Sequence, residues 1–223
     1  MTTLLSGYDR LTQALMFRVY AAEIPTAERK TRNRSSHFYA MDLLGAALAQ
    51  DFGVTHAKIV RKGLEKPLLV HEELHMNLSH CKGLAVAAVG KLPLGVDAEP
   101  PREVAEKLMR TVLTPREIID IQDNAQEPRE FRFSRYWTLK EAYTKYTGEG
   151  IRMPFSRLDF KLSTPRDSVR REGIEFQHPA AVKLHFYQII RENQYAVSLC
   201  VPRLAQFDIS KPAEGWELIT DGD

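Results

Sequence analysis

Three acidic residues have the types and the spacing of a divalent-cation site. Asp97 and Glu99 stand two positions apart, and Glu141 follows further along the chain. In a strand, residues i and i+2 point to the same face, so Asp97 and Glu99 would stand side by side. Two ionised carboxylates about 5 Å apart repel each other by roughly 3 kcal/mol at an effective dielectric constant near 20. A bound cation is the simplest way to offset that repulsion.

The third acid lies in a segment with a helical pattern. Trp137, Glu141 and Lys145 recur every four residues and therefore share one helix face. Taken alone, Glu141 and Lys145 would be an exposed ion pair worth only about 0.3 to 0.5 kcal/mol, which is common on helices. The acids Asp97 and Glu99 favour the other interpretation, in which a strand end and a helix face together hold a cation.

Ser79 and His80 are a second pair of chemically capable residues. Neighbours on a strand face opposite ways, so a serine nucleophile activated by this histidine is disfavoured. A turn at this point would instead direct both side chains at a phosphate. The alternative is a capping serine beside a structural histidine.

The segment His71-Glu72-Glu73-Leu74-His75 matches the H-E-x-x-H signature of zinc peptidases. That chemistry needs a helix that stacks the two histidines. Pro67 stands just upstream, however, and only about six residues separate Val70 from Asn77, so a helix of useful length barely fits. A chance match in a polar loop is the preferred interpretation, and a zinc metallopeptidase built on His71 and His75 is kept as an alternative.

The composition is that of an ordinary globular protein. The chain has 223 residues, 27% of them charged and 43% hydrophobic, with a net charge of +2. This mild charge fits anionic ligands or acidic partners and is far from a nucleic-acid-binding composition. The two cysteines form no CxxC pair, which indicates a reduced, cytoplasmic protein. The longest apolar run, Leu84 to Val89, is too short to span a bilayer, so we expect no export and no membrane anchor.

Periodicity and turn residues predict the following elements: helices over 36–50, 103–122 and 129–147, and strands over 58–60, 67–70, 84–89, 94–99, 159–162, 182–190 and 195–201. The strands 84–89 and 94–99 would form a hairpin. Thr114 and Glu117 are typical of a helix cap and restart, and Gly148 is the expected end of the long helix. The tail after Pro202 shows little pattern.

A block of helix and strands occurs in each half of the chain. The sequence therefore predicts an α+β fold with two comparable lobes. Pro100-Pro101 ends the strand before it because neither proline can donate to a ladder. The predicted division is an N-terminal lobe over 1–101 and a C-terminal lobe over 102–223.

Three motifs in this order resemble the Sfp-type 4′-phosphopantetheinyl transferases. That family carries N-[IL]-S-H, G-[IV]-D-x-E and W-[ST]-x-K-E-[AS]-x-x-K, which stand here at residues 77–80, 95–99 and 137–145. The matching region covers roughly residues 29–158. In two places the chain departs from the family: Glu65 replaces the usual glycine before Lys66, and no arginine stands near Met41-Asp42.

The resemblance implies a fold and an activity. The fold would be two similar α/β lobes related by a pseudo-twofold axis, with the active site in the cleft between them. The enzyme would act as a monomer and move the phosphopantetheine arm of coenzyme A to a serine of an apo acyl or peptidyl carrier protein with an acidic surface. The reaction would require Mg²⁺ and release adenosine 3′,5′-bisphosphate. The resemblance implies no nucleic-acid or membrane partner, and a non-catalytic module that binds coenzyme A or a carrier is the second alternative.

The resemblance also implies roles for individual residues. Asp97, Glu99 and Glu141 would hold the metal, and Glu141 would also take the proton from the carrier serine. Lys145 and His80 would donate to phosphate oxygens. The coenzyme-binding set would be Lys30, Arg32, Arg34, Lys66, Ser79, His80 and Lys145. Glu117 matches a further family acid near the site.

Overall fold

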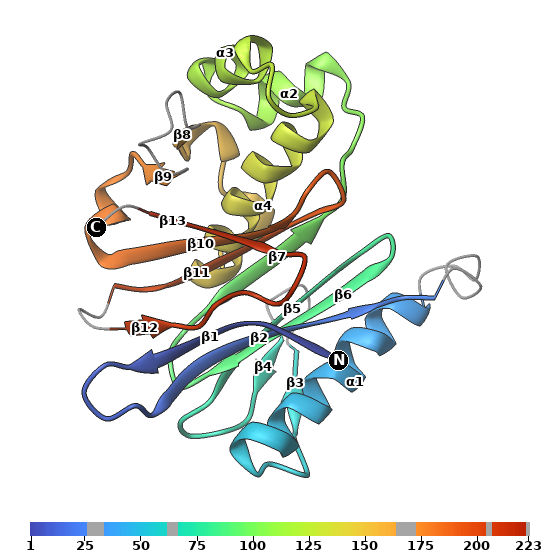
Figure 1. The fold of residues 1–223 in the computed structure, drawn as a ribbon, viewed down its shortest axis with the longest axis vertical. Coiled ribbons are helices and arrows are strands. Elements are labelled where there is room, and N and C mark those ends of the chain that lie inside the picture. Colours follow the sequence, from blue (N-terminus) through green and yellow to red (C-terminus); the bar gives the residue numbers. More distant parts are fainter. Residues whose placement is uncertain (26–33, 62–66, 164–172, 204–206, 222–223) are drawn as a thin grey trace.

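The structure is a computed structural model, which describes residues 1–25, 34–61, 67–163, 173–203 and 207–221 (Figure 1). Its α-helices are α1 (Arg34–Phe52), α2 (Glu106–Val112), α3 (Pro115–Asp123) and α4 (Arg129–Thr147). Its strands are β1 (Thr2–Asp9), β2 (Leu15–Glu23), β3 (Ile59–Val60), β4 (Leu68–Leu69), β5 (His75–Cys81), β6 (Leu84–Gly90), β7 (Gly95–Glu99), β8 (Phe160–Ser163), β9 (Gly173–Phe176), β10 (Leu184–Arg191), β11 (Tyr195–Pro202), β12 (Phe207–Ile209) and β13 (Glu217–Asp221). Short 3₁₀ helices cover Gly150–Arg152, Phe155–Arg157 and Pro179–Lys183.

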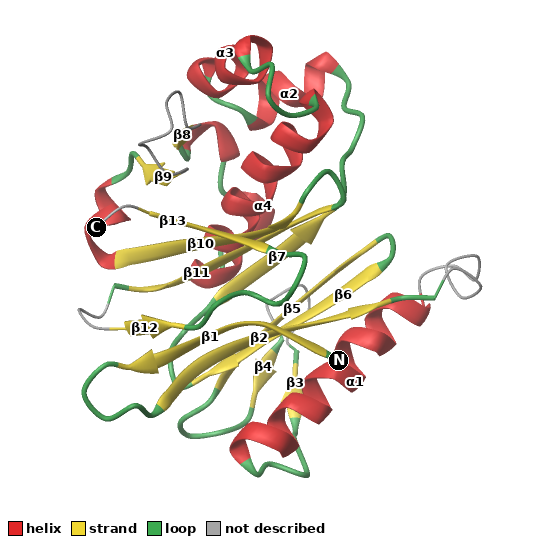
Figure 2. Cartoon of the chain, viewed as in Figure 1, coloured by secondary structure: helices red, strands yellow, loops and turns green. Residues whose placement is uncertain are grey.

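Two sheets pack face to face, and a long helix covers the outer side of each (Figure 2). The first sheet has the order β12-β1-β2-β6-β5, and the second has the order β7-β11-β10-β13-β9-β8. Apolar side chains such as Val86 and Leu199 fill the space between the sheets. Leu48 of α1 packs on the outer side of the first sheet, and Leu139 of α4 on that of the second. The layer order is therefore helix, sheet, sheet, helix.

The two halves repeat one arrangement of elements. In the first half, β2 is followed by α1 and the β5–β6 hairpin, and the strand order is β2-β6-β5. In the second half, β7 is followed by α4 and the β10–β11 hairpin, and the order is β7-β11-β10. All of these pairings are antiparallel. The predicted α+β fold with two similar lobes is confirmed.

Strands β7 and β12 each lie in a different sheet from the strand that precedes them in the chain. β7 pairs with β11 of the second sheet, and β12 pairs with β1 of the first. The predicted hairpin between 84–89 and 94–99 is therefore wrong, because β6 pairs with β2 and β5 instead. Val96 and Ala98 of β7 are buried between the sheets, which gives this strand its place at the edge of the second sheet. The division into lobes after residue 101 stays a proposal.

Local sequence signals place the helix ends of the second half. Thr114 and Glu117 form a complete capping box at the start of α3. Gly148 ends α4 in the left-handed region, with φ 81°. The strands β1, β2, β5, β9, β12 and β13 were not predicted, and the last two lie in the tail that shows little pattern. Among the described residues, no helix is long and apolar enough to cross a membrane.

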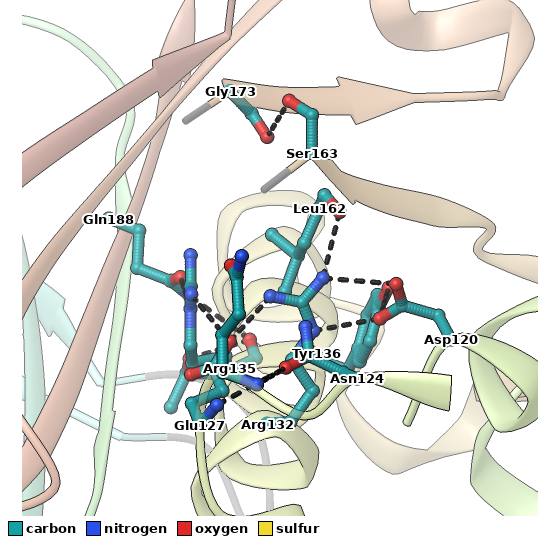
Figure 3. Close-up of polar contacts among 12 residues, drawn as sticks. Asp120, Asn124, Glu127, Arg132, Arg135, Tyr136, Leu162, Ser163, Gly173 and Gln188 are labelled. Carbon is teal, nitrogen blue, oxygen red and sulfur yellow. Dashed lines mark hydrogen bonds and ion pairs between the residues drawn. The ribbon is translucent and has the colours of Figure 1, made fainter. Parts of the chain in front are cut away.

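A buried polar network anchors α4 to its surroundings (Figure 3). Arg132 donates to both carboxylate oxygens of Asp120, at 2.7 and 3.0 Å, and to the Leu162 carbonyl at 2.8 Å. Arg135 donates to Gln188 at 2.7 Å, and Glu127 accepts from both arginines. These contacts join α4 to α3, β8 and β10. The helix that carries Glu141 is thus held by charge-assisted hydrogen bonds as well as by apolar packing.

Candidate active site

The site forms where the edges of the two sheets meet. β5 is an edge strand of the first sheet and β7 an edge strand of the second, and the two strands lie beside each other. Asn77 and Ser79, two positions apart on β5, face β7. The Asn77 Oδ1 accepts from the Val96 N–H at 2.8 Å, and the Ser79 hydroxyl accepts from the Ala98 N–H at 3.2 Å. Side chains of β5 therefore satisfy edge groups of β7 that have no strand partner.

Asp97 lies between these two anchored residues and is 5% exposed. Its Oδ1 accepts from the Ser79 hydroxyl at 2.8 Å and from Lys145 Nζ at 2.6 Å. Its Oδ2 is buried, and no hydrogen-bond donor among the described residues reaches it. A buried carboxylate oxygen without a partner is costly, so a cation that binds there would remove that cost.

The pKa values of Glu99 and Glu141 are both raised to about 7. Burial, then the charge of Asp97, raises the pKa of Glu99 to about 7, and Glu141 adds to this effect. Burial and the charge of Asp97 likewise raise the pKa of Glu141 to about 7. The three predicted acids therefore lie close enough to disfavour one another's charge, as expected where a cation is to be bound.

These oxygen donors fit a hard divalent ion such as Mg²⁺ by charge and chemistry. Across the described ranges, however, no three His, Cys, Asp or Glu side chains already converge as a complete ligand set. The buried Asp97 Oδ2 is the ligand oxygen that is ready to bind a cation. The assignment of all three acids as ligands stays a prediction.

Lys145 lies one helical turn after Glu141 and pairs with Asp97. Its side chain is 25% exposed, and its Nζ also contacts the Val96 carbonyl at 3.1 Å and the Ser79 hydroxyl at 3.2 Å. It therefore compensates one oxygen of Asp97 and one edge carbonyl of β7, and it keeps access to solvent.

His80 faces away from Asp97, toward α1. As expected for strand neighbours, Ser79 points to β7, whereas the His80 ring lies 6.0 Å from the His37 ring in an edge-to-face arrangement. Partial desolvation lowers the pKa of His80, with further contributions from the positive charges of His37 and Lys145. His37 was not predicted, because a histidine three positions after the Lys30–Arg34 cluster has no sequence signal of its own.

Gly95 explains the first position of the G-V-D-x-E motif. A Cβ at this residue would lie 2.1 Å from the Ala142 carbonyl oxygen and 2.4 Å from the Tyr146 nitrogen. Non-bonded contacts of a Cβ atom are essentially never this short, so only glycine at position 95 lets α4 approach β7 this closely. Sequence reasoning missed this role, since the contact joins residues far apart in the chain.

Glu117, which the resemblance places near the site, pairs with Lys140, the sequence neighbour of Glu141. It is fully buried and pairs with Lys140 Nζ at 2.6 Å. Its other oxygen accepts from the Phe160 N–H at 2.9 Å. Lys140 also donates to the carbonyls of Val112, Phe155 and Leu158. The pair joins α4 to the segments on either side of it, and its role is structural.

The structure does not support the zinc-peptidase alternative. Glu72 and Glu73 form a bend, and β5 begins at His75, so the two histidines lie on no common helix. His71 Nδ1 instead accepts from the Glu73 N–H at 3.1 Å. The H-E-x-x-H match is a coincidence of sequence.

Several predicted coenzyme ligands lie beyond what the structure describes. Lys30, Arg32 and Lys66 fall outside the described residues, and so does the side chain of Arg34. Their assignment to the nucleotide stays a prediction.

In comparisons with known proteins, residues 93–200 match the family model of the 4′-phosphopantetheinyl transferase superfamily. The 4′-phosphopantetheinyl transferase HetI of Nostoc sp. is 33% identical over 131 residues, which cover 56% of this chain and 54% of that protein. The 4′-phosphopantetheinyl transferase psf-1 of Bacillus pumilus is 29% identical over 132 residues, 59% of this chain and 55% of its own. The chain thus spans about half the length of these curated relatives. The solved holo-[acyl-carrier-protein] synthase of Thermotoga maritima is 20% identical, with a TM-score of 0.38 over 58% of this chain and 83% of that one.

Proposed function

We propose that the chain is a member of the 4′-phosphopantetheinyl transferase superfamily, whose family model matches residues 93–200, and that it transfers the phosphopantetheine arm of coenzyme A to an apo carrier protein. In this reaction the serine hydroxyl of the carrier forms a bond to the β-phosphorus of coenzyme A. The pyrophosphate bond breaks, and adenosine 3′,5′-bisphosphate leaves. The observation that supports this most strongly is the cluster of three acids beside Lys145 at the junction of the two sheets.

Asp97, Glu99 and Glu141 would hold Mg²⁺, with the buried Asp97 Oδ2 as the oxygen that lacks another partner. When bound, the ion would neutralise the diphosphate of coenzyme A. Attack on a phosphoryl group is mostly a matter of positioning and of charge, so the remaining work falls to residues that orient the reactants.

Glu141 is the proposed base. Without metal, burial and the charge of Asp97 raise the pKa of the Glu141 carboxyl group to about 7, and a bound cation would lower that pKa and keep the carboxylate ionised near neutral pH. An ionised carboxylate beside the metal can accept the proton that the carrier serine loses. The proton of the serine hydroxyl would move to Glu141 directly or through one water.

Lys145 and His80 would donate to the phosphate oxygens. Lys145 is cationic and partly exposed, so it is able to turn from Asp97 toward an incoming anion. The lowered pKa of His80 keeps most of its imidazole neutral near pH 7, so it would act through an N–H hydrogen bond rather than through a full charge. Lys30, Arg32, Arg34, Lys66 and Ser79 are the residues proposed to hold the nucleotide end.

We further propose an acidic carrier as the partner, a cytoplasmic location and a monomeric enzyme. A basic protein, with pI near 8.5, favours an acidic partner through long-range attraction. The absence of a CxxC pair or a larger cysteine set fits a reducing compartment. The monomer rests on the two internally paired lobes, which already bury each other's sheet faces.

Mass spectrometry of an apo carrier incubated with the protein, coenzyme A and Mg²⁺ tests the activity. We expect the carrier to gain the mass of one phosphopantetheine group, and this gain to disappear with a chelator or in the Glu141→Gln variant. Coenzyme A binding with no mass gain on acyl or peptidyl carriers would favour the non-catalytic module instead.

A further inference from the structure

We propose that Asn77 is a positioning residue: together with Ser79 it fixes β7 so that Asp97 presents Oδ2, and only Oδ2, to the cation. The inference rests on the proposed function for the identity of the ion. Asn77 touches neither the Asp97 side chain nor, in this proposal, the substrates, so it acts through the backbone of β7.

The first step of the argument concerns the backbone on either side of Asp97. β7 pairs with β11 with Asp97 opposite Ser198, and the N–H groups of Val96 and Ala98, on either side of Asp97, donate to side chains of β5. Asn77 accepts the first of these N–H groups and Ser79 the second. Two acceptors on β5 thus fix β7 immediately before and immediately after the acid.

The second step concerns the two oxygens of Asp97, which have different surroundings. Oδ1 accepts from Ser79 and Lys145, whereas Oδ2 is buried without a donor among the described residues. The position of the β7 backbone determines how close the carboxylate lies to Ser79 and Lys145, and so which oxygen position is left without a donor. The two anchors hold that backbone in place, so the carboxylate is ready to bind a cation through one oxygen.

The third step concerns the cost of losing the anchor. Asn77 is 5% exposed, so water has little access to the Val96 N–H when the amide is removed. A buried donor without a partner costs about 1 to 3 kcal/mol, and β7 would move to find another acceptor. Residues that orient a metal ligand without touching the metal typically change metal affinity by about 10- to 100-fold when they are replaced.

The test compares Asn77→Leu, which keeps the size and removes the acceptor, with Met76→Ala as the matched control. Met76 is the neighbour of Asn77 on the same strand, is equally buried, and packs on the opposite face against α1. Mn²⁺ affinity, measured by electron paramagnetic resonance without coenzyme or carrier, is the primary readout. We expect Asn77→Leu to weaken Mn²⁺ binding about tenfold. Met76→Ala should lower the stability of the protein and leave its Mn²⁺ affinity unchanged.

Kinetics provide the second readout. The concentration of Mg²⁺ that gives half-maximal transfer should rise with Asn77→Leu, whereas kcat at saturating Mg²⁺ should stay within about threefold of the wild type. If Asn77→Leu does not fold, Ser79→Ala replaces it, and Ser79→Thr, which keeps the hydroxyl, should restore Mn²⁺ affinity.

Three results would overturn the inference: wild-type protein that binds no Mn²⁺, unchanged Mn²⁺ affinity in folded Asn77→Leu, or equal weakening in Met76→Ala. Failure of the proposed function looks different. A wild type that transfers nothing to any carrier but loses Mn²⁺ affinity with Asn77→Leu would refute the proposed function and leave this inference standing.

Discussion

Gly95 lies directly beneath the carbonyl oxygen of Ala142, and a Cβ at residue 95 would come within 2.1 Å of that oxygen. Ala142 follows Glu141, and Gly95 precedes Asp97 by two positions on the same face of β7. The contact therefore sets how near the acid of the helix lies to the acids of the strand.

Gly95→Ala is expected to impair the site more than the fold. The new methyl group must push α4 away from β7, at a cost of about 1 to 3 kcal/mol, and Glu141 moves with the helix. We expect transfer to fall at least about tenfold and Mn²⁺ affinity to fall with it, as a 1 Å displacement of a reacting group can cause. Urea unfolding and the transfer assay measure the two effects.

Gly45→Ala is the control for that variant. Gly45 lies within α1, and a Cβ there meets nothing within 4 Å. Alanine should stabilise the helix by about 0.5 to 1 kcal/mol and leave transfer unchanged. If Gly95→Ala behaved in the same way, the close approach of α4 and β7 would not matter for catalysis.

Lys140→Met should destabilise the protein strongly, because it leaves Glu117 buried without its cation and removes the donor to three carbonyls. Breaking a buried pair by removing one partner typically costs about 3 to 5 kcal/mol. The double variant Lys140→Met/Glu117→Gln should recover part of that loss. Lys161→Met, which breaks an exposed pair with Glu175, should cost at most about 1 kcal/mol, and all four proteins can be compared by urea unfolding.

The raised pKa of Glu141 predicts a pH-dependent effect of Glu141→Gln on stability. The folded-state pKa is about 7 and the ordinary value is 4.5, so between these values the folded protein holds the proton more tightly than the unfolded chain. The free energy of unfolding of the wild type therefore falls as pH rises from about 4.5 to about 7, and glutamine removes this loss. Without metal, Glu141→Gln should match the wild type near pH 4.5 and exceed it by about 1 to 3 kcal/mol at pH 8.

Added Mg²⁺ should reverse that advantage. The ion stabilises the ionised carboxylates, so the increase in melting temperature of the wild type on Mg²⁺ addition should be larger at pH 8 than at pH 6. Glu141→Gln should show a smaller increase at both pH values and no transfer. An equal increase in both proteins would argue against Glu141 as a ligand.

Electrostatic attraction to an acidic carrier predicts that transfer weakens with salt. Screening shortens the range of attraction from about 10 Å at 0.1 M to about 3 Å at 1 M ionic strength, which lowers the association rate. The kcat/KM for the carrier should fall steeply with ionic strength, whereas kcat at saturating carrier should change little. A kcat/KM that is constant over this range would refute charge-driven docking.

Much of the second half could be predicted from the sequence alone. The bounds of α4, Arg129–Thr147, and the capping box of Thr114 and Glu117 match the structure. These features depend on residues within one or two turns of each other. Asp97 and Glu99 also stand out by local spacing, because alternate residues of any strand share a face.

The tertiary structure decided what distant residues do to one another. β7 does not form the predicted hairpin with β6 but pairs with β11 of the second sheet, and Asn77 and Ser79 of β5 hold its backbone there. Lys140, adjacent in sequence to Glu141, points inward and pairs with Glu117, whereas burial and the charge of Asp97 raise the pKa of Glu141. The sequence determined which chemical groups are available and which local elements carry them. Which groups are paired, buried or left ready for a cation depended on sheet edges and close approaches between segments far apart in the chain.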